Sequence, residues 1–289
     1  MEVASLILAA GRGTRMTGYG GCKALLPLIP SEQSQRPVPT IYEGTHPFIL
    51  EILNQLPLGP KAIVIHHDAD RIQKVVKSNL PENLQPVFIW QPELNGTGGA
   101  VLAGKPFLQS VSSELCLITM GDVPLISRNT YCLLLEKTID TGSAGTVLAF
   151  RPANKGQYGC LITEGDSVKA IIEWKYWKEL ETKGEPVSEL CNAGVYAFRR
   201  NLLLECLSHL SAKPHLVQKN IDGRPVTFEE FFLTDVVEIL NQNGFMISFV
   251  EAGEEEVLGV DTPEQLQRAQ EIYRQNLTAL SYIGNTKRL

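Results

Sequence analysis

Strand-like and helix-like stretches alternate through the first half of the chain, with short connections between them. Repeated strand, helix, strand units are typical of right-handed crossovers, which build a parallel sheet covered by helices on both faces. The strand-like stretches are residues 5–10, 61–67, 86–90 and 115–120, and the helix-like stretches are 46–56, 68–80 and 96–108. This alternation predicts an α/β, Rossmann-like fold.

The second half has a different pattern. Strand-like stretches follow one another with fewer long helices at residues 143–150, 158–163, 167–174 and 193–198, which favours antiparallel additions and a mixed, mostly parallel sheet. Residues 29–47 and 211–227 lack periodicity and predict two long loops. Thr262, Pro263 and Gln265 form a helix-start signal before an apolar stripe, so we expect a C-terminal helix over 262–280 and a tail over 281–289.

The composition excludes several classes of protein. With 289 residues, 44% of them hydrophobic, the chain can bury a large core, and its net charge of −6 argues against a broad nucleic-acid surface. No apolar run is long enough to span a bilayer. The six cysteines show no C-x-x-C spacing, which indicates reduced thiols and a cytoplasmic protein. His66 and His67 are adjacent but predict surface or capping roles more than a metal site. Whether the chain forms a homo-oligomer stays open.

The stretch "LILAAGRGTRM", residues 6–16, leads from the first strand into a turn that is both flexible and cationic. Gly11 and Gly13 remove side chains and let backbone N–H groups approach a ligand, and a polyanion suits such groups. The turn lacks the third glycine of a dinucleotide motif and the Gly-Lys-Ser/Thr of a P-loop. Taken alone, it favours an ordinary strand-to-helix turn over a phosphate site, because short motifs match by chance.

Ligands of open parallel sheets bind beyond the carboxyl ends of the strands. Arg15 and Lys23 follow the first strand, Gln91 and the flexible "NGTGG" of residues 95–99 follow the third, and Asp122 follows the fourth. Asp261 follows a short strand-like stretch near the C-terminus. Two carboxylates facing two cations indicate a Mg²⁺–polyphosphate site. Each aspartate alone is also compatible with a turn or a helix cap.

Eight motifs resemble, in order, those of sugar-1-phosphate nucleotidyltransferases. They are "LILAAGRGTRM" with Lys23, "QPELNGTGGA", "GDVPL", "YGCLI", "AIIEWK", "NAGVYAF", "FFLTDVV" and "GVDTPEQL". The likeness spans about residues 3–270 and is greatest to the pyrophosphorylase domain of bacterial N-acetylglucosamine-1-phosphate uridyltransferase. It implies the nucleotide-diphospho-sugar transferase fold over a single domain, residues 1–280, with a nucleotide-binding part over 1–140 and an acceptor-binding part over 141–261.

The resemblance also implies roles for individual residues. The residues that would bind the nucleotide are Ala10, Gly11, Gly13, Gln91, Gly96 and Thr97. Arg15 and Lys23 would be catalytic and would neutralise the triphosphate, and Asp122 and Asp261 would hold Mg²⁺. The sugar of the acceptor would be positioned by Gly159, Glu173 and Asn192. Carboxylate and amide groups suit sugar hydroxyls. Asn192 followed by Ala-Gly is also compatible with a tight turn.

The chain departs from the pattern of the uridyltransferases. Gly99 stands where they usually have histidine, Asp261 stands where they have asparagine, and Trp174 and Ala193 alter the sugar side. The acetyltransferase half has no counterpart, so acetyl transfer is not expected.

The resemblance thus implies a Mg²⁺-dependent enzyme that joins a nucleoside triphosphate, UTP or dTTP, to a sugar 1-phosphate such as N-acetylglucosamine 1-phosphate and releases pyrophosphate. Two alternatives stay open. One is a cytidylyl- or molybdopterin-type transferase with a non-sugar phosphate acceptor, and the other is a non-catalytic nucleotide-binding regulatory protein.

Overall fold

The computed structural model describes residues 2–11, 13, 15–31, 41–221 and 224–286. Its central strands are β1 (Ala4–Leu8), β4 (Lys61–Ile65), β5 (Val87–Trp90), β6 (Leu115–Met120), β7 (Gly145–Phe150), β8 (Cys160–Glu164), β9 (Ser167–Ile172), β10 (Cys191–Arg199) and β13 (Ile247–Glu251). Within the described residues they form one sheet in the order β5-β4-β1-β6-β10-β7-β13-β9-β8.

The strand directions confirm the mixed, mostly parallel sheet. β5, β4, β1 and β6 are parallel, and β10 is antiparallel to both of its neighbours, β6 and β7. β13 is parallel to β7, while β9 is antiparallel to β13 and to β8. The parallel strands therefore present their carboxyl ends at one edge, as expected of an α/β fold.

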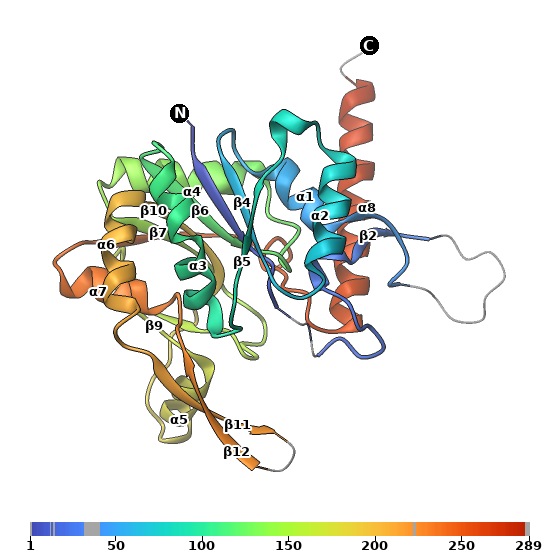
Figure 1. Ribbon diagram of the computed structural model, residues 1–289. Helices are drawn as coiled ribbons and strands as arrows, with labels where there is room; N and C mark the ends of the chain where they lie inside the picture. Colours follow the sequence, from blue (N-terminus) through green and yellow to red (C-terminus); the bar gives the residue numbers. More distant parts are fainter. Residues whose placement is uncertain (1, 12, 14, 32–40, 222–223, 287–289) are drawn as a thin grey trace.

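Helices cover both faces of the sheet (Figure 1). Their bounds are α1 (Phe48–Gln55), α2 (Ala69–Asn79), α3 (Gly96–Ser110), α4 (Arg128–Asp140), α5 (Trp174–Thr182), α6 (Arg200–Leu210), α7 (Asp235–Gln242) and α8 (Pro263–Thr286). One core lies between the sheet and α3, α6 and α7, and a second lies between the sheet and α1, α2 and α4. The apolar stripe of each helix packs against one face of the sheet, which accounts for the arrangement of a sheet between two layers of helices.

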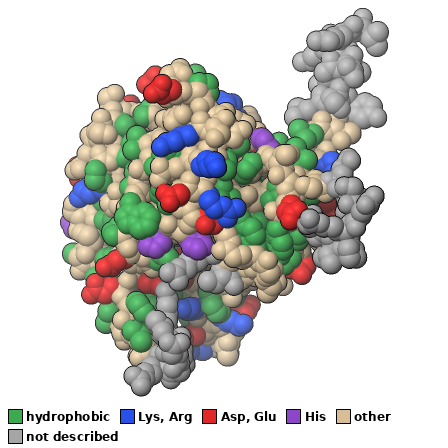
Figure 2. Space-filling model, turned by 45° about the vertical axis from the view of Figure 1, so that its right-hand side comes forward, with side chains coloured by type: hydrophobic (Ala, Val, Ile, Leu, Met, Phe, Trp, Pro, Cys, Tyr) green, Lys and Arg blue, Asp and Glu red, His purple; other side chains and the backbone are tan. Residues whose placement is uncertain are grey.

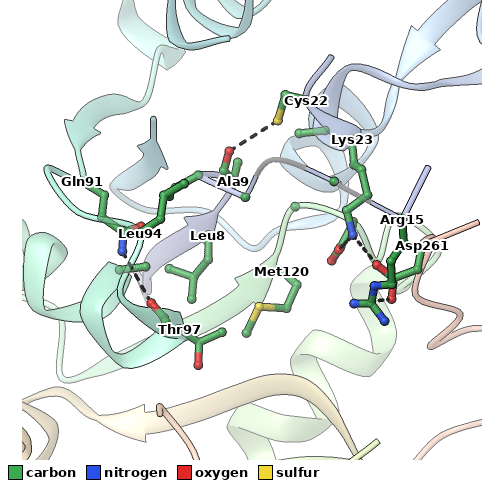
Figure 3. A pocket seen from close by; sticks show the side chains of 18 of the residues that line it. Leu8, Ala9, Arg15, Cys22, Lys23, Gln91, Leu94, Thr97, Met120 and Asp261 are labelled. Atoms are coloured by element: carbon green, nitrogen blue, oxygen red, sulfur yellow. Dashed lines mark hydrogen bonds and ion pairs between the residues drawn. The ribbon is translucent and has the colours of Figure 1, made fainter. Parts of the chain in front are cut away.

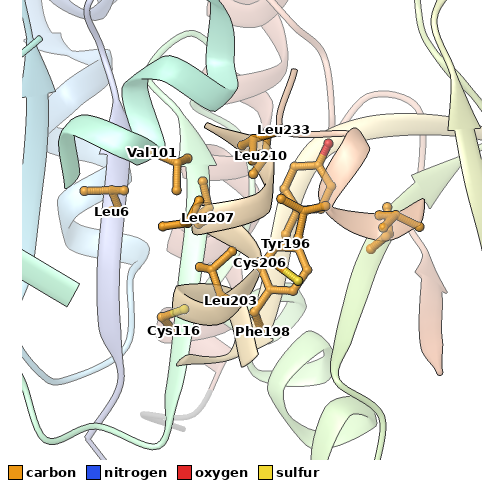
Figure 4. Packing of buried hydrophobic residues seen from close by; sticks show 14 of the residues in the cluster. Leu6, Val101, Cys116, Tyr196, Phe198, Leu203, Cys206, Leu207, Leu210 and Leu233 are labelled. Carbon is orange, nitrogen blue, oxygen red and sulfur yellow. The ribbon is translucent and has the colours of Figure 1, made fainter. Parts of the chain in front are cut away.

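The first of these cores joins the two halves of the chain (Figure 4). Leu6 of β1 and Cys116 of β6 lie in the same cluster as Leu203 and Leu207 of α6. All four side chains are fully buried. Because β10 lies between β6 and β7, packing from the second half stabilises the strands that end at the candidate site.

The C-terminal helix starts as the sequence predicts. Gln265 Oε1 accepts a hydrogen bond from the Thr262 N–H at 3.0 Å, and Thr262 Oγ1 accepts one from the Gln265 N–H at 3.3 Å, which is a capping box. The predicted end was wrong, because α8 continues through residues 281–286 to Thr286. The remainder of the predicted tail, residues 287–289, lies outside the described residues.

Both predicted long loops were wrong in part. Residues 29–47 contain strand segments, because β2 (Pro27–Pro30) pairs with β3 (Gly44–Pro47); the residues between them, 32–40, lie outside the described part. Residues 211–227 contain most of a hairpin, β11 (His215–Ile221) and β12 (Arg224–Glu230). Figure 1 shows this hairpin extending from the body of the molecule beside α5. Neither pair belongs to the central sheet: β2 contributes Leu28 to a separate small core, and the hairpin strands are largely exposed.

Charge is mixed on the molecular face in Figure 2, where basic and acidic side chains are interspersed with apolar and neutral ones. Among the described residues, no helix is long and apolar enough to cross a membrane.

Candidate active site

A cavity of about 470 Å³ lies at the carboxyl ends of β1, β5 and β6 (Figure 3). Figure 3 shows Gln91, Leu94 and Thr97 at one end of it and Lys23, Arg15 and Asp261 at the other, with Leu8 and Met120 between them. The residues that were predicted to bind nucleotide, metal and phosphate all line it: Ala10, Gly11, Gly13, Arg15, Lys23, Gln91, Gly96, Thr97, Asp122 and Asp261. The structure therefore brings these ten residues together.

The glycine turn after β1 makes room for Lys23. Gly13 has a φ of +62°, and a Cβ atom there would lie 2.7 Å from the Cγ of Lys23. A side chain at position 13 would thus meet both backbone strain and the stem of the lysine. Gly11, by contrast, has no atom within 4 Å of a Cβ position, and its side faces open space.

Lys23 lies between the two predicted metal ligands. Its Nζ contacts the Asp122 carboxylate and lies 2.7 Å from Asp261 Oδ1, although only 12% of the lysine side chain is exposed. Burial acts to lower the pKa of Lys23, but the two carboxylates outweigh it, and the pKa is raised above its ordinary value. The two carboxylates therefore converge on one cation, across 139 residues of sequence (261 − 122).

Arg15 connects this ion-pair cluster to the second half of the chain. One guanidinium nitrogen lies 3.1 Å from Asp261 Oδ2, and another donates to Gln157 Oε1 at 2.9 Å. The side chain is 57% exposed, so the guanidinium lies at the mouth of the cavity.

In the described part of the chain, no group of three or more His, Cys, Asp or Glu side chains is arranged to hold a metal.

Gln91 lies at the opposite end and is 2% exposed. Its Nε2 donates to Asn95 Oδ1 at 3.2 Å. A Cβ at position 99 would lie 1.7 Å from that same oxygen, so the glycine that departs from the uridyltransferase pattern is what leaves room for the Asn95 amide.

The glycine-rich start of α3 packs against the segment after β12. Gly96 has a φ of +93°, and a Cβ there would lie 2.4 Å from the Phe231 carbonyl oxygen. The Gly98 N–H donates to that oxygen at 2.8 Å, and the Thr97 hydroxyl accepts from the Leu233 N–H at 3.1 Å. These bonds join the predicted nucleotide loop to the chain segment 231–233.

The predicted acceptor residues Gly159, Glu173 and Asn192 form a separate group. The Asn192 N–H donates to the Gly159 carbonyl at 2.8 Å, and a Cβ at Gly159 would lie 3.9 Å from the Glu173 carboxyl carbon. None of the three is in the lining of the cavity as the described residues define it. Their group lies beside the cavity, because Gly194 of the same strand as Asn192 packs on the cavity residue Met120.

Hydrogen bonds within the protein fix the acceptor group. Thr234 Oγ1 donates to Glu173 Oε1 at 2.8 Å, and Asn192 Nδ2 donates to the Tyr196 hydroxyl at 2.6 Å. Burial raises the pKa of the Glu173 carboxyl, and the nearby negative charge of Asp235 raises it further. The hydrogen bond from Thr234 lowers this pKa, but the net shift is upward. Burial therefore outweighs the single side-chain hydrogen bond from Thr234 in setting this pKa.

Sequence reasoning missed Glu230, which lines the cavity from the end of β12. This residue directly precedes the "FFLTDVV" motif, and the unusual pair Glu229–Glu230 was the available signal. It also missed His215, whose Nε2 lies 2.8 Å from Asp235 Oδ2 and whose ring packs on Phe232. Both lay in or beside the stretch that was predicted to be a loop.

Comparisons with known proteins identify relatives over most of the chain. The chain is 33% identical over 276 residues to the bifunctional protein GlmU of Rhodopseudomonas palustris, an alignment that covers 94% of this chain and 53% of that protein. It is 31% identical over 275 residues to GlmU of Geobacillus sp., with 94% and 52% covered. The chain thus spans about half the length of these relatives, and the resemblance to sugar-1-phosphate nucleotidyltransferases is confirmed.

Solved structures share the fold. A uridine diphosphate N-acetylglucosamine pyrophosphorylase from Trypanosoma brucei aligns with a TM-score of 0.68 at 13% identity, over 93% of this chain and 64% of that one. A CMP:2-keto-3-deoxy-manno-octonic acid synthetase complexed with CTP aligns with a TM-score of 0.61 at 16% identity, over 96% and 100%. The sequence profile of the MobA-like NTP transferase domain matches residues 5–213. The chain therefore belongs to the family of MobA-like NTP transferase domains.

Proposed function

We propose that this protein transfers a nucleotidyl group from UTP or dTTP to a sugar 1-phosphate, such as N-acetylglucosamine 1-phosphate, and releases pyrophosphate. A phosphate oxygen of the acceptor attacks the α-phosphorus in line, a new P–O bond forms, and the bond to the β-phosphate oxygen breaks. No covalent enzyme intermediate is required, so positioning and neutralisation of charge supply the catalysis.

The observation that carries this proposal is the ion-pair cluster of Lys23, Asp122 and Asp261 at one end of the cavity, with Gln91 at the other. A nucleoside triphosphate needs cations for its phosphates and amide or backbone groups for its base. The cavity offers these at opposite ends of one space, which matches an extended nucleotide. A turn or capping role for the aspartates would require neither the lysine between them nor the convergence of two distant parts of the chain.

The protein's own residues have distinct tasks in this reaction. Lys23 and Arg15 neutralise the phosphates and stabilise the negative charge on the departing pyrophosphate. Gly11 and Gly13 allow the backbone to approach those phosphates closely. The turn after β1 is both small and cationic because it must admit a nucleotide and hold its charge.

The residues present also fit a divalent cation. Asp122 and Asp261 already share one cationic partner, the buried Lys23 ammonium, and carboxylate oxygens are the ligands that Mg²⁺ prefers. These two aspartates would hold the ion, with water completing its coordination. When bound, Mg²⁺ supplies positive charge to the phosphate oxygens.

The base preference follows from Gln91. With its Nε2 donating to Asn95, the Oε1 of this amide remains available to accept from a ligand. The imide N–H of uracil or thymine is such a donor, whereas the ring nitrogen of cytosine at that position is an acceptor. UTP and dTTP are therefore the expected substrates.

The acceptor assignment rests on Glu173 and Asn192, which lie beside the cavity and carry the groups that bind sugar hydroxyls. Glu230 at the end of β12 adds a further carboxylate to the lining of the cavity. A carboxylate that is buried with one side-chain hydrogen bond can accept further bonds from a hydroxylated ligand.

The test is pyrophosphate release across a panel of nucleoside triphosphates and phosphorylated acceptors, with Mg²⁺ or with EDTA. We expect turnover with UTP or dTTP and a sugar 1-phosphate, and loss of turnover in EDTA. The Lys23→Gln variant is the negative control. Turnover confined to CTP or GTP with a non-sugar phosphate would support the cytidylyl- or molybdopterin-type alternative. Nucleotide binding without turnover for any pair would support a regulatory protein.

A further inference from the structure

The tripeptide His66-His67-Asp68, at the point where β4 ends, contacts both sides of the proposed nucleotide site. Asp68 adopts φ +57°, one of the two positive values among the described non-glycine residues, and it precedes α2 directly. Aspartate tolerates this left-handed conformation better than most residues, but glycine would adopt it with less strain. An aspartate at this position therefore indicates that its side chain does something that glycine could not.

The Asp68 carboxylate binds the segment that carries Lys23. Its Oδ2 accepts a hydrogen bond from the backbone N–H of Cys22 at 2.8 Å and lies 3.2 Å from Arg71 Nη1. A Cβ at Gly21 would lie 3.1 Å from the same oxygen and 2.7 Å from the Tyr19 hydroxyl. The glycine lets the carboxylate reach the backbone just before Lys23.

The two histidines extend this contact in opposite directions. The His67 ring donates from Nε2 to the Gly20 carbonyl at 3.1 Å, because a carbonyl can only accept. The His66 ring donates from Nδ1 to the Gln91 carbonyl at 2.7 Å and stacks on Trp90, with ring centroids 4.7 Å apart. One short turn therefore holds the backbone on the phosphate side and the backbone of the residue assigned to the base.

We propose that His66, His67 and Asp68 form a positioning clamp that fixes Lys23 relative to Gln91, with Asp68 as its main member. This inference rests on the proposed function and goes beyond it, because none of the three residues lines the cavity as the described residues define it. They act through the backbone of residues 20–22 and 91. A nucleoside triphosphate that spans the cavity depends on both segments at once, so loss of the clamp lowers affinity for the nucleotide and leaves acceptor binding unchanged.

Two substitutions at position 68 separate the hydrogen bond from the backbone conformation. Asp68→Asn keeps an acceptor oxygen and tolerates positive φ, so it should keep KM for UTP within about threefold of wild type. Asp68→Gly adopts the same φ without strain but removes the acceptor. We expect Asp68→Gly to raise KM for UTP about tenfold, which is about 1.4 kcal/mol.

KM for the sugar phosphate should change less than about twofold, and the unfolding midpoint should not fall. Asp70→Asn, at an exposed carboxylate two residues away, is the matched control.

Amide hydrogen exchange of the peptide that covers residues 19–25 gives a second readout that does not depend on turnover. Exchange should increase in Asp68→Gly and remain at the wild-type level in Asp68→Asn. Unchanged exchange in the glycine variant would overturn the clamp whether or not the protein turns over. Increased exchange with an unchanged KM for UTP, or an equal rise in both KM values, would overturn its role in nucleotide positioning. Absence of turnover in the wild-type protein refutes the proposed function instead.

Discussion

The two ends of the proposed reaction site are built by different means. The nucleotide side, which we define as Gly13, Lys23, Gln91, Asp122 and Asp261, relies on a glycine conformation and on ion pairs at one end of the cavity. The acceptor side, defined as Gly159, Glu173 and Asn192, relies on hydrogen bonds that partly buried side chains make with Thr234 and Tyr196. Gln91 and Asp122 of the nucleotide side follow parallel strands, whereas the acceptor side lies among antiparallel ones. Asp261 was expected to follow a strand, but residues 252–260 form turns and irregular backbone.

This difference indicates where such a protein can change. Approach of backbone to phosphate and neutralisation of its charge depend on a few atoms, and any added side chain at Gly13 would collide with Lys23. Hydrogen bonds between side chains can be replaced by others without moving the backbone. Under the proposed function, we therefore expect the nucleotide side to support the chemistry and the acceptor side to set which phosphate is accepted.

The largest effect is expected at the nucleotide side. Asp122→Asn removes one of the two negative charges around Lys23 and one carboxylate from the proposed cation set. We expect kcat to fall on the order of 10²-fold or more, as loss of electrostatic stabilisation usually does. Steady-state pyrophosphate release measures it, with Asp166→Asn, an exposed turn residue, as control. A variant within threefold of wild type would remove Asp122 from the mechanism.

A smaller and more selective effect is expected at the acceptor side. Glu173→Ala removes a carboxylate that would bind a sugar hydroxyl, a contact worth roughly 1.5–3 kcal/mol. Since about 1.4 kcal/mol is tenfold, kcat/KM for the acceptor should fall by tens to hundreds of fold. Calorimetric titration with UTP and Mg²⁺ should give nearly the wild-type affinity. Equal losses for nucleotide and acceptor in a folded variant would contradict the division into two sides.

Position 99 tests the base end of the nucleotide side. A methyl group in Gly99→Ala would displace the Asn95 amide and leave Gln91 Nε2 with only its 3.5 Å bond to the Gly96 carbonyl. The Gln91 amide can then rotate, so we expect the preference for UTP over CTP to fall by about tenfold, roughly the value of one neutral hydrogen bond. Competition between the two nucleotides measures this ratio. Gly253→Ala is the control, because a Cβ there meets no atom within 4 Å. If the preference for UTP over CTP does not change, the orientation of the Gln91 amide does not determine the choice of base.

The smallest effect concerns stability and has opposite signs at two carboxylates. The pKa of Glu173 is raised, mainly by burial, so its stabilising contribution is present below the ordinary glutamate pKa and is lost as pH rises through the folded-state value. Glu173→Gln should therefore raise the unfolding midpoint more at pH 7 than at pH 4. A midpoint that falls at pH 7 would show that the Glu173 carboxylate is structurally required.

Glu51 provides the contrast. Burial acts to raise its pKa, but hydrogen bonds from His46, Gln55 and Tyr273 prevail and hold the pKa below the ordinary value. Its contribution is present above the ordinary glutamate pKa and is lost as pH falls through the folded-state value. Glu51→Gln should lower the midpoint more at pH 7 than at pH 4. Thermal unfolding at the two pH values measures both variants, and equal signs would contradict the contrast.

The sequence predicted that Arg15, Gln91 and Asp122 would lie near one another because each of them follows a strand in the parallel part of the sheet. Hydrophobic patterning locates such strands, and parallel strands end at a common edge, so the order of the amino acids was enough to place Arg15, Gln91 and Asp122 together. The ion-pair partners could not be derived in this way, because the pattern does not specify that Lys23 contacts both Asp122 and Asp261.

The hairpin β11–β12 was missed for a physical reason. Its strands pair with each other and not with the central sheet, and Leu216 is 71% exposed, so no alternating buried face marks them. Glu230 was missed with them. The tripeptide after β4 was considered only as a metal or surface motif, since its partners Cys22 and Gln91 lie far away in sequence.

The ion pair between Lys23 and Asp261 joins residues 238 positions apart and has a consequence for synthesis of the chain. At about 5–20 residues per second, roughly 10–50 s pass between the incorporation of the lysine and that of the aspartate. During this interval the nascent chain carries the turn after β1 and Asp122 but lacks the second carboxylate. The charge balance around Lys23 is therefore completed only when the segment that starts α8 has left the ribosome.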